Sequence, residues 1–427
     1  MHDQATTTCM EASRPGVLSK VSQLRENFPA IKKYPKTIFF DNSSTTQKPY
    51  QVIEAMHSFY ENSCANSNRA AYALANKLHH QVEETRNHVA KFLNAKPSDI
   101  AFTSGATDSL NLVANSWGLV NLRDGDQIML CLDDHQSAIL PWFNLQSQLQ
   151  RLGKNIEIVP FSMHYRGMYD RDDIRAKIST KTRLVAMSHI HHLYGLEWDQ
   201  KDLADLRKHL SKDALLSLDA SQSIGHAMVD AQALNVDFIS FSGHKMFAAN
   251  GVGILWVNPD IRTTIWPIRI GSKSSTKIIE NRIHIDKSSL AGLLECGTLN
   301  LPAIFSLKAA LEFVDSIDMI NIEEYLSHLT HLLYQKLKDI PGIEFAPGFA
   351  SYDCAKGFGI IGFRIANVTS NDLAQYLDQQ QIFVRSGDYC LGSKSSEDAD
   401  YIRISLHIYN TEEEIDCFTQ TIETALA

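Results

Sequence analysis

The sequence predicts an α/β fold in which a mostly parallel sheet carries helices on both faces. Short apolar runs alternate with helical segments over residues 99–257. This alternation is typical of a parallel sheet, because each connection between parallel strands has to cross from one end of the sheet to the other. The length of 427 residues exceeds what one core usually fills, so we expect one large domain and one smaller domain.

The elements of the large domain follow from the spacing of apolar residues. Residues 52–94 carry a helical pattern, in which Arg86, Val89 and Ala90 recur at helical spacing, and residues 109–117 carry a second one. Short apolar runs predict the strands, and helical segments separate most of them. The predicted strands are residues 99–103, 127–132, 156–161, 183–188, 215–219, 237–241 and 253–257.

The C-terminal part has a different pattern. A long helix is predicted over residues 303–316, followed by an α+β region with strands at 343–345, 359–365 and 401–405. Thr411 is a good N-cap for a final helix, and Glu414 completes a capping box. We therefore predict an N-terminal leader segment (1–35), a large α/β domain (36–300) and a small α+β domain (301–427).

Composition narrows the class of protein. A net charge of −9 argues against a nucleic-acid-binding surface, and no apolar run approaches the roughly 20 residues of a membrane span. The first fifteen residues lack the basic start and apolar core of a secretory signal. The seven cysteines are scattered and form no C-x-x-C pair, which favours a reducing cytoplasm over disulfides or zinc.

Two polar side chains at strand ends carry the main functional signal. One apolar run ends in Asp219, and the next leads into the polar turn that holds Lys245. Pyridoxal phosphate needs an amine that holds its aldehyde as a Schiff base and a carboxylate that keeps its ring nitrogen protonated. Lys245 and Asp219 could supply these two groups, so the sequence predicts a pyridoxal phosphate site.

Two further turns support this hypothesis. Ser104-Gly105-Ala106-Thr107 joins a strand to a helix, where free N–H groups can bind phosphate; taken alone, a plain N-cap turn explains it better. His135 follows the strand 127–132, where its flat ring could stack on a pyridine ring, although a solvated loop histidine is an equal alternative.

Several short motifs occur along nearly the whole chain, in the order in which a known enzyme family carries them. The chain resembles the class V (fold type I) pyridoxal phosphate enzymes, most of all the Suf-type cysteine desulfurases and selenocysteine lyases. The motifs that carry the resemblance are residues 40–49, 102–107, His135, 141–142, 219–222, 242–245, 295–300, 384–390 and 403–405.

The resemblance implies a role for individual residues. Lys245 would form the Schiff base and later carry a proton, and Asp219 would pair with the pyridinium nitrogen. Arg403 would bind the substrate α-carboxylate, since guanidinium geometry suits a bidentate pair, and Asn42 is a second expected substrate contact. The other expected cofactor contacts are His135 on the ring, Gln222 on the phenolic oxygen, and Ala106, Thr107, Ser242, His244 and Thr298 on phosphate.

The resemblance also implies a reaction and partners. Cysteine would form an external aldimine and then a quinonoid, and the Cys390 thiolate would take the substrate sulfur as a persulfide while alanine is released. Thr298 would reach a phosphate in a neighbouring subunit, which implies a homodimer with shared active sites. A sulfur-acceptor protein is a further partner that such a reaction suggests.

The sequence departs from the family pattern near the substrate. His192 replaces an asparagine, either as a benign exchange of hydrogen-bond donor or as a titratable group beside the substrate. Asp388 and Tyr389 replace two histidines before Cys390, and a carboxylate there would oppose thiolate formation, which leaves Cys390 as either nucleophile or structural thiol. Residues 68–72 and the pair Ala248-Ala249 also differ, and we expect both to shape the pocket walls.

These departures leave three functions open. The first is sulfur removal from cysteine or a close derivative. The second is the same fold acting on another amino acid by C–S lysis, elimination, epimerisation or transamination, with His192 as a catalytic candidate. The third is a non-catalytic protein that binds the cofactor or a partner, which the presence of Lys245, Asp219 and Arg403 disfavours.

Overall fold

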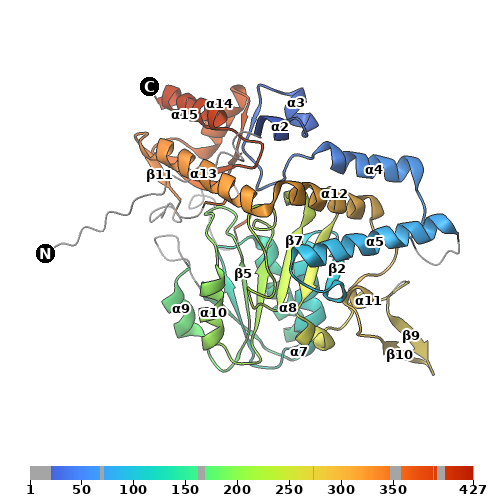
Figure 1. The fold of residues 1–427 in the computed structure, drawn as a ribbon. Coiled ribbons are helices and arrows are strands. Elements are labelled where there is room, and N and C mark those ends of the chain that lie inside the picture. Colours follow the sequence, from blue (N-terminus) through green and yellow to red (C-terminus); the bar gives the residue numbers. More distant parts are fainter. Residues whose placement is uncertain are drawn as a thin grey trace.

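The computed structural model describes residues 21–67, 72–161, 169–272, 274–346, 357–387, 389–391 and 400–426. Its centre is a sheet in the order β2-β8-β7-β6-β5-β3-β4 (Figure 1). Among these strands β8 alone runs in the opposite direction to the other six, so the predicted mostly parallel sheet is confirmed. The strands are β2 (Ile100–Thr103), β3 (Gln127–Cys131), β4 (Glu157–Phe161), β5 (Thr182–Ser188), β6 (Leu215–Asp219), β7 (Phe238–Ser242) and β8 (Gly253–Val257).

Alternate residues of the strands enter two different cores. On β3, Ile128 and Leu130 belong to one buried cluster, whereas Met129 and Cys131 belong to the other. A strand sends successive side chains to opposite faces, so both faces of this sheet are covered by apolar side chains. The helices that build these layers are α5 (Ala73–Phe92), α6 (Ala106–Leu112), α7 (Leu119–Asn121), α8 (Gln136–Arg151), α9 (Arg171–Lys177), α10 (Gln200–His209), α11 (Leu290–Leu294) and α12 (Leu301–Ile317).

Two predicted helices differ from the structure. The pattern over residues 52–94 forms two helices, α4 (Tyr50–Asn62) and α5, which lie along α12 (Figure 1). The run 109–117 begins as α6 and continues as a π-helical turn over Val113–Gly118. In that turn Trp117 packs edge-on against Phe238, a tertiary contact that apolar spacing alone does not reveal.

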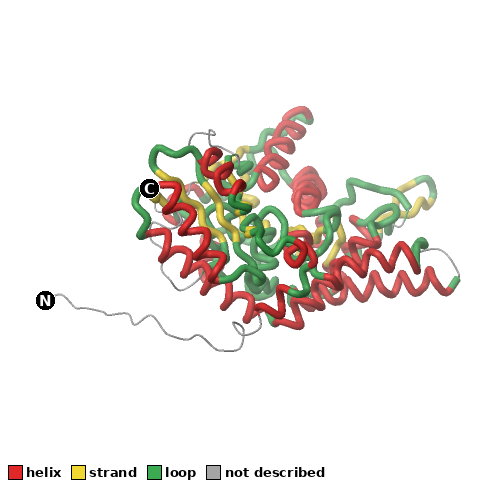
Figure 2. Tube along the Cα trace, turned by 90° about the horizontal axis from the view of Figure 1, so that it is seen from above, coloured by secondary structure: helices red, strands yellow, loops and turns green. Residues whose placement is uncertain are grey.

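A second, antiparallel sheet lies beside the first, in the order β11-β12-β15-β14. Its strands are β11 (Ile343–Phe345), β12 (Ile360–Ile365), β14 (Arg385–Ser386) and β15 (Ile402–Ser405), and its helices are α13 (Met319–Lys338), α14 (Ser370–Gln379) and α15 (Glu412–Leu426). Figure 2 shows these strands beside helices at the C-terminal end of the molecule. The predicted capping box is present, because Thr411 Oγ1 accepts from Glu414 N and Glu414 Oε2 from Thr411 N, both at 3.2 Å.

The N-terminal segment joins this second sheet region. Strand β1 (Ile38–Phe39) pairs in parallel with β13 (Ile382–Phe383). Helices α2 (Val21–Arg25) and α3 (Pro29–Lys33) flank Phe28, which is fully buried against Phe247 and Tyr409. The part of the predicted leader from Val21 to Phe28 is therefore packed against the fold, whereas residues 32–35 are exposed.

One hairpin has no counterpart in the sequence prediction. Strands β9 (Thr276–Ile279) and β10 (Arg282–Ile285) project from the large sheet region (Figure 1). Glu280 and Asn281 both have positive φ, of 50° and 59°, as a two-residue type I′ turn requires. Among the described helices, none has the length and apolarity to cross a bilayer.

Candidate active site

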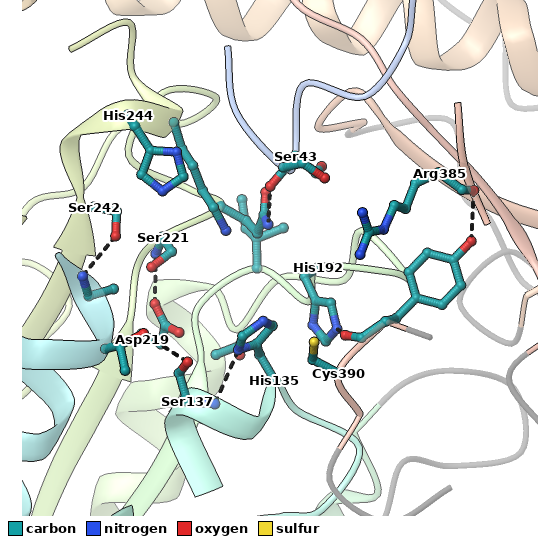
Figure 3. Close-up of a pocket in the computed structure, with 18 of the residues that line it drawn as sticks. Ser43, His135, Ser137, His192, Asp219, Ser221, Ser242, His244, Arg385 and Cys390 are labelled. Carbon is teal, nitrogen blue, oxygen red and sulfur yellow. Dashed lines mark hydrogen bonds between the residues drawn. The ribbon is translucent and has the colours of Figure 1, made fainter. Parts of the chain in front are cut away.

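A cavity of about 240 Å³ opens at the carboxyl ends of β3, β5, β6 and β7, where the segment around β14 and β15 meets the large sheet (Figure 3). Ligands of open α/β sheets bind at this edge. All but two of the predicted site residues line the cavity: Ala106, Thr107, His135, His192, Asp219, Gln222, Ser242, His244, Lys245, Cys390 and Arg403. The exceptions are Asn42 and Thr298.

Lys245 ends the short turn Gly243–Lys245 that follows β7. Burial lowers the pKa of its amine to about 8, although the Asp219 carboxylate opposes this shift. About a tenth of the amine is therefore neutral at pH 7, and the neutral form is the one that attacks an aldehyde. Gly225 allows the close approach of this turn, since a Cβ there would lie 2.7 Å from the Lys245 carbonyl oxygen.

A second segment holds the turn from the other side. The His244 carbonyl oxygen accepts from Lys48 Nζ at 2.8 Å, from Thr46 Oγ1 at 3.1 Å and from Thr46 N at 3.2 Å. Thr46 Oγ1 in turn accepts from Phe247 N at 2.9 Å. These contacts fix the backbone on both sides of Lys245, so its side chain starts from a defined position.

Asp219 lies at the end of β6, on the same side of the sheet as Lys245. Its side chain is 7% exposed, and Oδ1 accepts from Ser221 N at 2.9 Å. Gln222 Nε2 donates to the Ser43 carbonyl at 3.1 Å, whereas Gln222 Oε1 has no partner among the described residues. Buried polar atoms that lack a hydrogen-bond partner are rare in folded proteins, and they are expected where a polar ligand binds.

The predicted phosphate contacts meet at the start of α6. Ala106 N donates to Ser242 Oγ at 2.7 Å, and Thr107 Oγ1 lies 2.9 Å from Ser137 Oγ. Burial lowers the pKa of His244 to about 4, so its ring is neutral. Together with the Lys245 amine and the Asp219 carboxylate, these donors and hydroxyls fit an aldehyde, a pyridine nitrogen and a phosphate, so the residues present fit pyridoxal phosphate.

We expect Gly253→Ala to weaken cofactor binding about tenfold. A Cβ on Gly253 would lie 2.5 Å from Gly105 Cα, so β8 would push the turn before Ala106 away from its place. Equilibrium dialysis of the cofactor measures the dissociation constant. Gly271→Ala is the control, because its added Cβ meets nothing closer than Cys296 Cβ at 3.9 Å. Equal dissociation constants for the two variants would contradict this role of Gly253.

His135 is the N-cap of α8, and its Nδ1 accepts from Ser137 N at 3.1 Å. The same loop holds the Cys390 segment, since Gln136 N donates to the Cys390 carbonyl at 2.7 Å. A backbone bridge also joins His135 to Leu391. Main-chain hydrogen bonds thus bring a thiol from the C-terminal part of the chain into the cavity.

Cys390 has a φ of 55°, a left-handed conformation that is uncommon for a residue with a Cβ. Asp388, the expected unfavourable neighbour of this thiol, lies outside the described residues, as do residues 68–71. Ala248 and Ala249 are buried in the main core and do not line the cavity, contrary to the expectation that they shape its walls.

Arg403 projects from β15 with its side chain almost fully buried. Its guanidinium donates to Asp41 Oδ1 and Ser44 Oγ, both at 2.9 Å, and to the His192 carbonyl at 3.1 Å. Nε has no partner among the described residues. Arg385 also lines the cavity, from β14 directly opposite Arg403, and sequence reasoning assigned it no role. Arg385 lies next to Arg403 only because β14 pairs with β15, and nothing in the sequence indicates that pairing.

The structure places two predicted residues elsewhere. Asn42 is fully buried, and its Nδ2 donates to the Ser405 carbonyl at 2.6 Å and to Asn410 Oδ1 at 3.1 Å. It holds the N-terminal segment to β15 and does not line the cavity, so its contact with substrate stays a prediction. Thr298 is exposed and lines a separate depression near Ser104 and Cys296.

Comparisons with known proteins show the family to which the chain belongs. Residues 38–418 match the family model described as Aminotransferase class-V. The chain is 32% identical to a probable cysteine desulfurase of Synechocystis sp., over 96% of both chains, and 31% identical to a cysteine desulfurase of Salmonella agona, over 93% and 96%.

Solved structures resemble the whole chain. The apo cysteine desulfurase of Thermococcus onnurineus NA1 superposes with a TM-score of 0.86 at 28% identity, covering 95% of this chain and 97% of that one. The cysteine desulfurase CsdA of Escherichia coli gives 0.83 at 26%, over 95% and 98%. Because residues 38–418 match the family model and Lys245 and Asp219 line one cavity, the chain belongs to the aminotransferase class-V family of pyridoxal phosphate enzymes.

Proposed function

We propose that this enzyme removes sulfur from L-cysteine and leaves alanine. The observation that carries the proposal is a single cavity that holds the Lys245 amine, the Asp219 carboxylate and the Cys390 thiol. The names of the relatives from Synechocystis and Salmonella support the choice of substrate. When bound, pyridoxal phosphate supplies the electron sink that makes bonds at the substrate α-carbon labile.

The residues of the chain would divide the remaining work. Arg403 binds the α-carboxylate through donors not engaged by Asp41, Ser44 and His192, and so orients the substrate. Lys245, with a pKa of about 8, takes the α-proton and later returns it.

Cys390 would complete the reaction. Its thiolate attacks the substrate sulfur, a sulfur–sulfur bond forms, and the Cβ–S bond breaks with its electron pair left on Cβ. Cβ then takes up the proton that Cys390 released. The sum is cysteine plus enzyme thiol giving alanine plus enzyme persulfide, with no external oxidant or reductant.

The test is the product mixture from cysteine. We expect one alanine per sulfur transferred, with sulfide released once a thiol reductant is added, measured by mass spectrometry and a sulfide assay. Pyruvate and ammonia in place of alanine would indicate C–S lysis by elimination and would overturn the proposal.

We expect Cys390→Ser to abolish the persulfide and to lower alanine formation at least ~100-fold, since a serine hydroxyl is a far weaker nucleophile at neutral pH. Intact-mass measurement after incubation with cysteine would show the missing sulfur. Cys417→Ser is the control, because Cys417 is an exposed thiol on α15. Undiminished alanine formation by Cys390→Ser would exclude the persulfide route.

We also propose a homodimer with shared active sites, a sulfur-acceptor protein and a cytoplasmic location. The exposed position of Thr298, outside the cavity, supports a contact with a second subunit. Ile278 and Ile283 on the projecting hairpin are exposed apolar side chains that such a contact would cover. Light scattering on the purified protein tests the dimer, and Thr298→Ala should weaken cofactor binding only in the dimeric form.

A further inference from the structure

The two ring nitrogens of His192 have different surroundings. Nε2 lies 2.9 Å from the carbonyl oxygen of Tyr389, which can only accept a hydrogen bond. Nε2 therefore carries the ring proton. Nδ1 is buried and has no hydrogen-bond partner within the part of the chain that the structure describes. In this tautomer Nδ1 is an acceptor, and the ring lines the cavity.

The ring remains neutral because it is buried next to other basic groups. Burial lowers the pKa of His192 well below its usual range, and His191, His135, Arg403 and Lys245 lower it further. The His192 side chain is only 4% exposed, so water does not readily satisfy Nδ1. A buried acceptor without a partner costs free energy, which a ligand that donates a hydrogen there would recover.

The contacts of the His192 backbone and ring indicate which part of the substrate would lie near Nδ1. The carbonyl of His192 accepts from Arg403 Nη1 at 3.1 Å, next to the proposed site of the α-carboxylate. The ring is bonded to Tyr389, one peptide bond before Cys390. It also lies edge to face with His135, at 5.3 Å between ring centroids, and Figure 3 shows it next to both His135 and Cys390. The substrate group between a bound carboxylate and the attacking thiol is the sulfur-bearing side chain.

We propose that His192 selects substrates whose side chain carries a hydrogen on sulfur, by accepting that S–H at Nδ1. This inference rests on the proposed desulfurase function. A sulfinate or a selenolate has no such hydrogen at neutral pH and would place its own lone pairs against the lone pair of Nδ1. The neutral thiol is also the form that a Cys390 thiolate attacks without charge repulsion, and its hydrogen stays on the outer sulfur of the persulfide.

The test compares two substrates in two proteins. Alanine formation from cysteine and from cysteine sulfinate gives the ratio of their kcat/KM values. In His192→Asn the amide NH₂ can donate to an anion, so we expect the ratio to shift about tenfold toward the sulfinate, as the exchange of one hydrogen bond predicts. His57→Asn, a matched change at an exposed histidine on α4, should leave the ratio unchanged.

A second readout does not depend on turnover. In protein with ¹⁵N-labelled histidine, the Nδ1 signal of His192 should show an unprotonated nitrogen throughout the neutral pH range. An unchanged substrate ratio in His192→Asn, or a protonated Nδ1, would overturn the inference and leave the desulfurase function standing. If neither substrate yields alanine in the unaltered enzyme, the proposed function fails, and the inference fails with it.

Discussion

Replacing Lys245 by alanine should leave a folded protein that has lost turnover by ~10⁴-fold or more. The lysine is expected to hold the cofactor covalently and to move the α-proton, and positioned proton transfer alone contributes up to about 10⁴. Its removal also relieves the burial of an amine whose pKa is already lowered to about 8. We therefore expect no loss of stability from the missing charge.

Three measurements check this expectation. Borohydride reduction followed by digestion should label Lys245 in the unaltered enzyme and no lysine in the variant. Absorbance of the bound cofactor should shift, and alanine formation should fall to the background rate. Lys308→Ala, which removes a surface pair with Glu84, is the control and should behave like the unaltered enzyme. Cofactor attached to a different lysine of the unaltered enzyme after borohydride reduction would show that the assignment of Lys245 is wrong.

Much of the large sheet could be predicted from the sequence because its strands are buried on both faces. Such strands are continuous apolar runs, and they end where polar ligand-binding residues begin. The run at β6 ends at Asp219, and the run at β7 leads directly to Lys245. Chemistry at a strand end is therefore visible in the sequence before any contact between strands is known.

Side chains whose partners lie far along the chain could not be placed in this way. Asn42 follows a strand near the N-terminus, and nothing local shows that its amide is taken by Ser405 and Asn410. The tautomer of His192 depends on the carbonyl of Tyr389, which lies 197 positions later in the chain, next to Cys390. Arg385 becomes a cavity residue only because β14 pairs with β15. Each of these facts depends on tertiary pairing, which residue spacing does not encode.

Breaking the buried ion pair of Arg86 and Glu295 should have the largest effect on stability among the changes that we consider. The guanidinium of Arg86, on α5, binds both carboxylate oxygens of Glu295 at 2.6 and 3.0 Å. Glu295 Oε1 also accepts from Phe102 N, and Arg86 Nη1 donates to the Ile100 carbonyl, so the pair ties α5 to β2. β2 leads into the turn before Ala106, which links this pair to the phosphate contacts.

Arg86→Ala should lower the free energy of unfolding by about 3–5 kcal/mol, because it leaves the Glu295 carboxylate buried without a counter-charge. Arg364→Ala is the matched control: Arg364 pairs with Glu344 at 2.7 Å, but those side chains are 48% and 52% exposed, against 5% and 9% for Arg86 and Glu295. The exposed pair should contribute less than about 1 kcal/mol.

Urea denaturation of the cofactor-loaded proteins, followed by far-ultraviolet circular dichroism, gives the two midpoints. A double variant, Arg86→Met with Glu295→Leu, should recover much of the loss, because it removes both charges and keeps apolar volume. Similar midpoints for Arg86→Ala and Arg364→Ala would mean that breaking the buried pair costs no more stability than breaking the exposed pair. Arg86→Met alone keeps side-chain volume but leaves the Glu295 carboxylate unpaired, so recovery in the double variant and not in Arg86→Met would assign the loss to the unpaired carboxylate and not to missing volume.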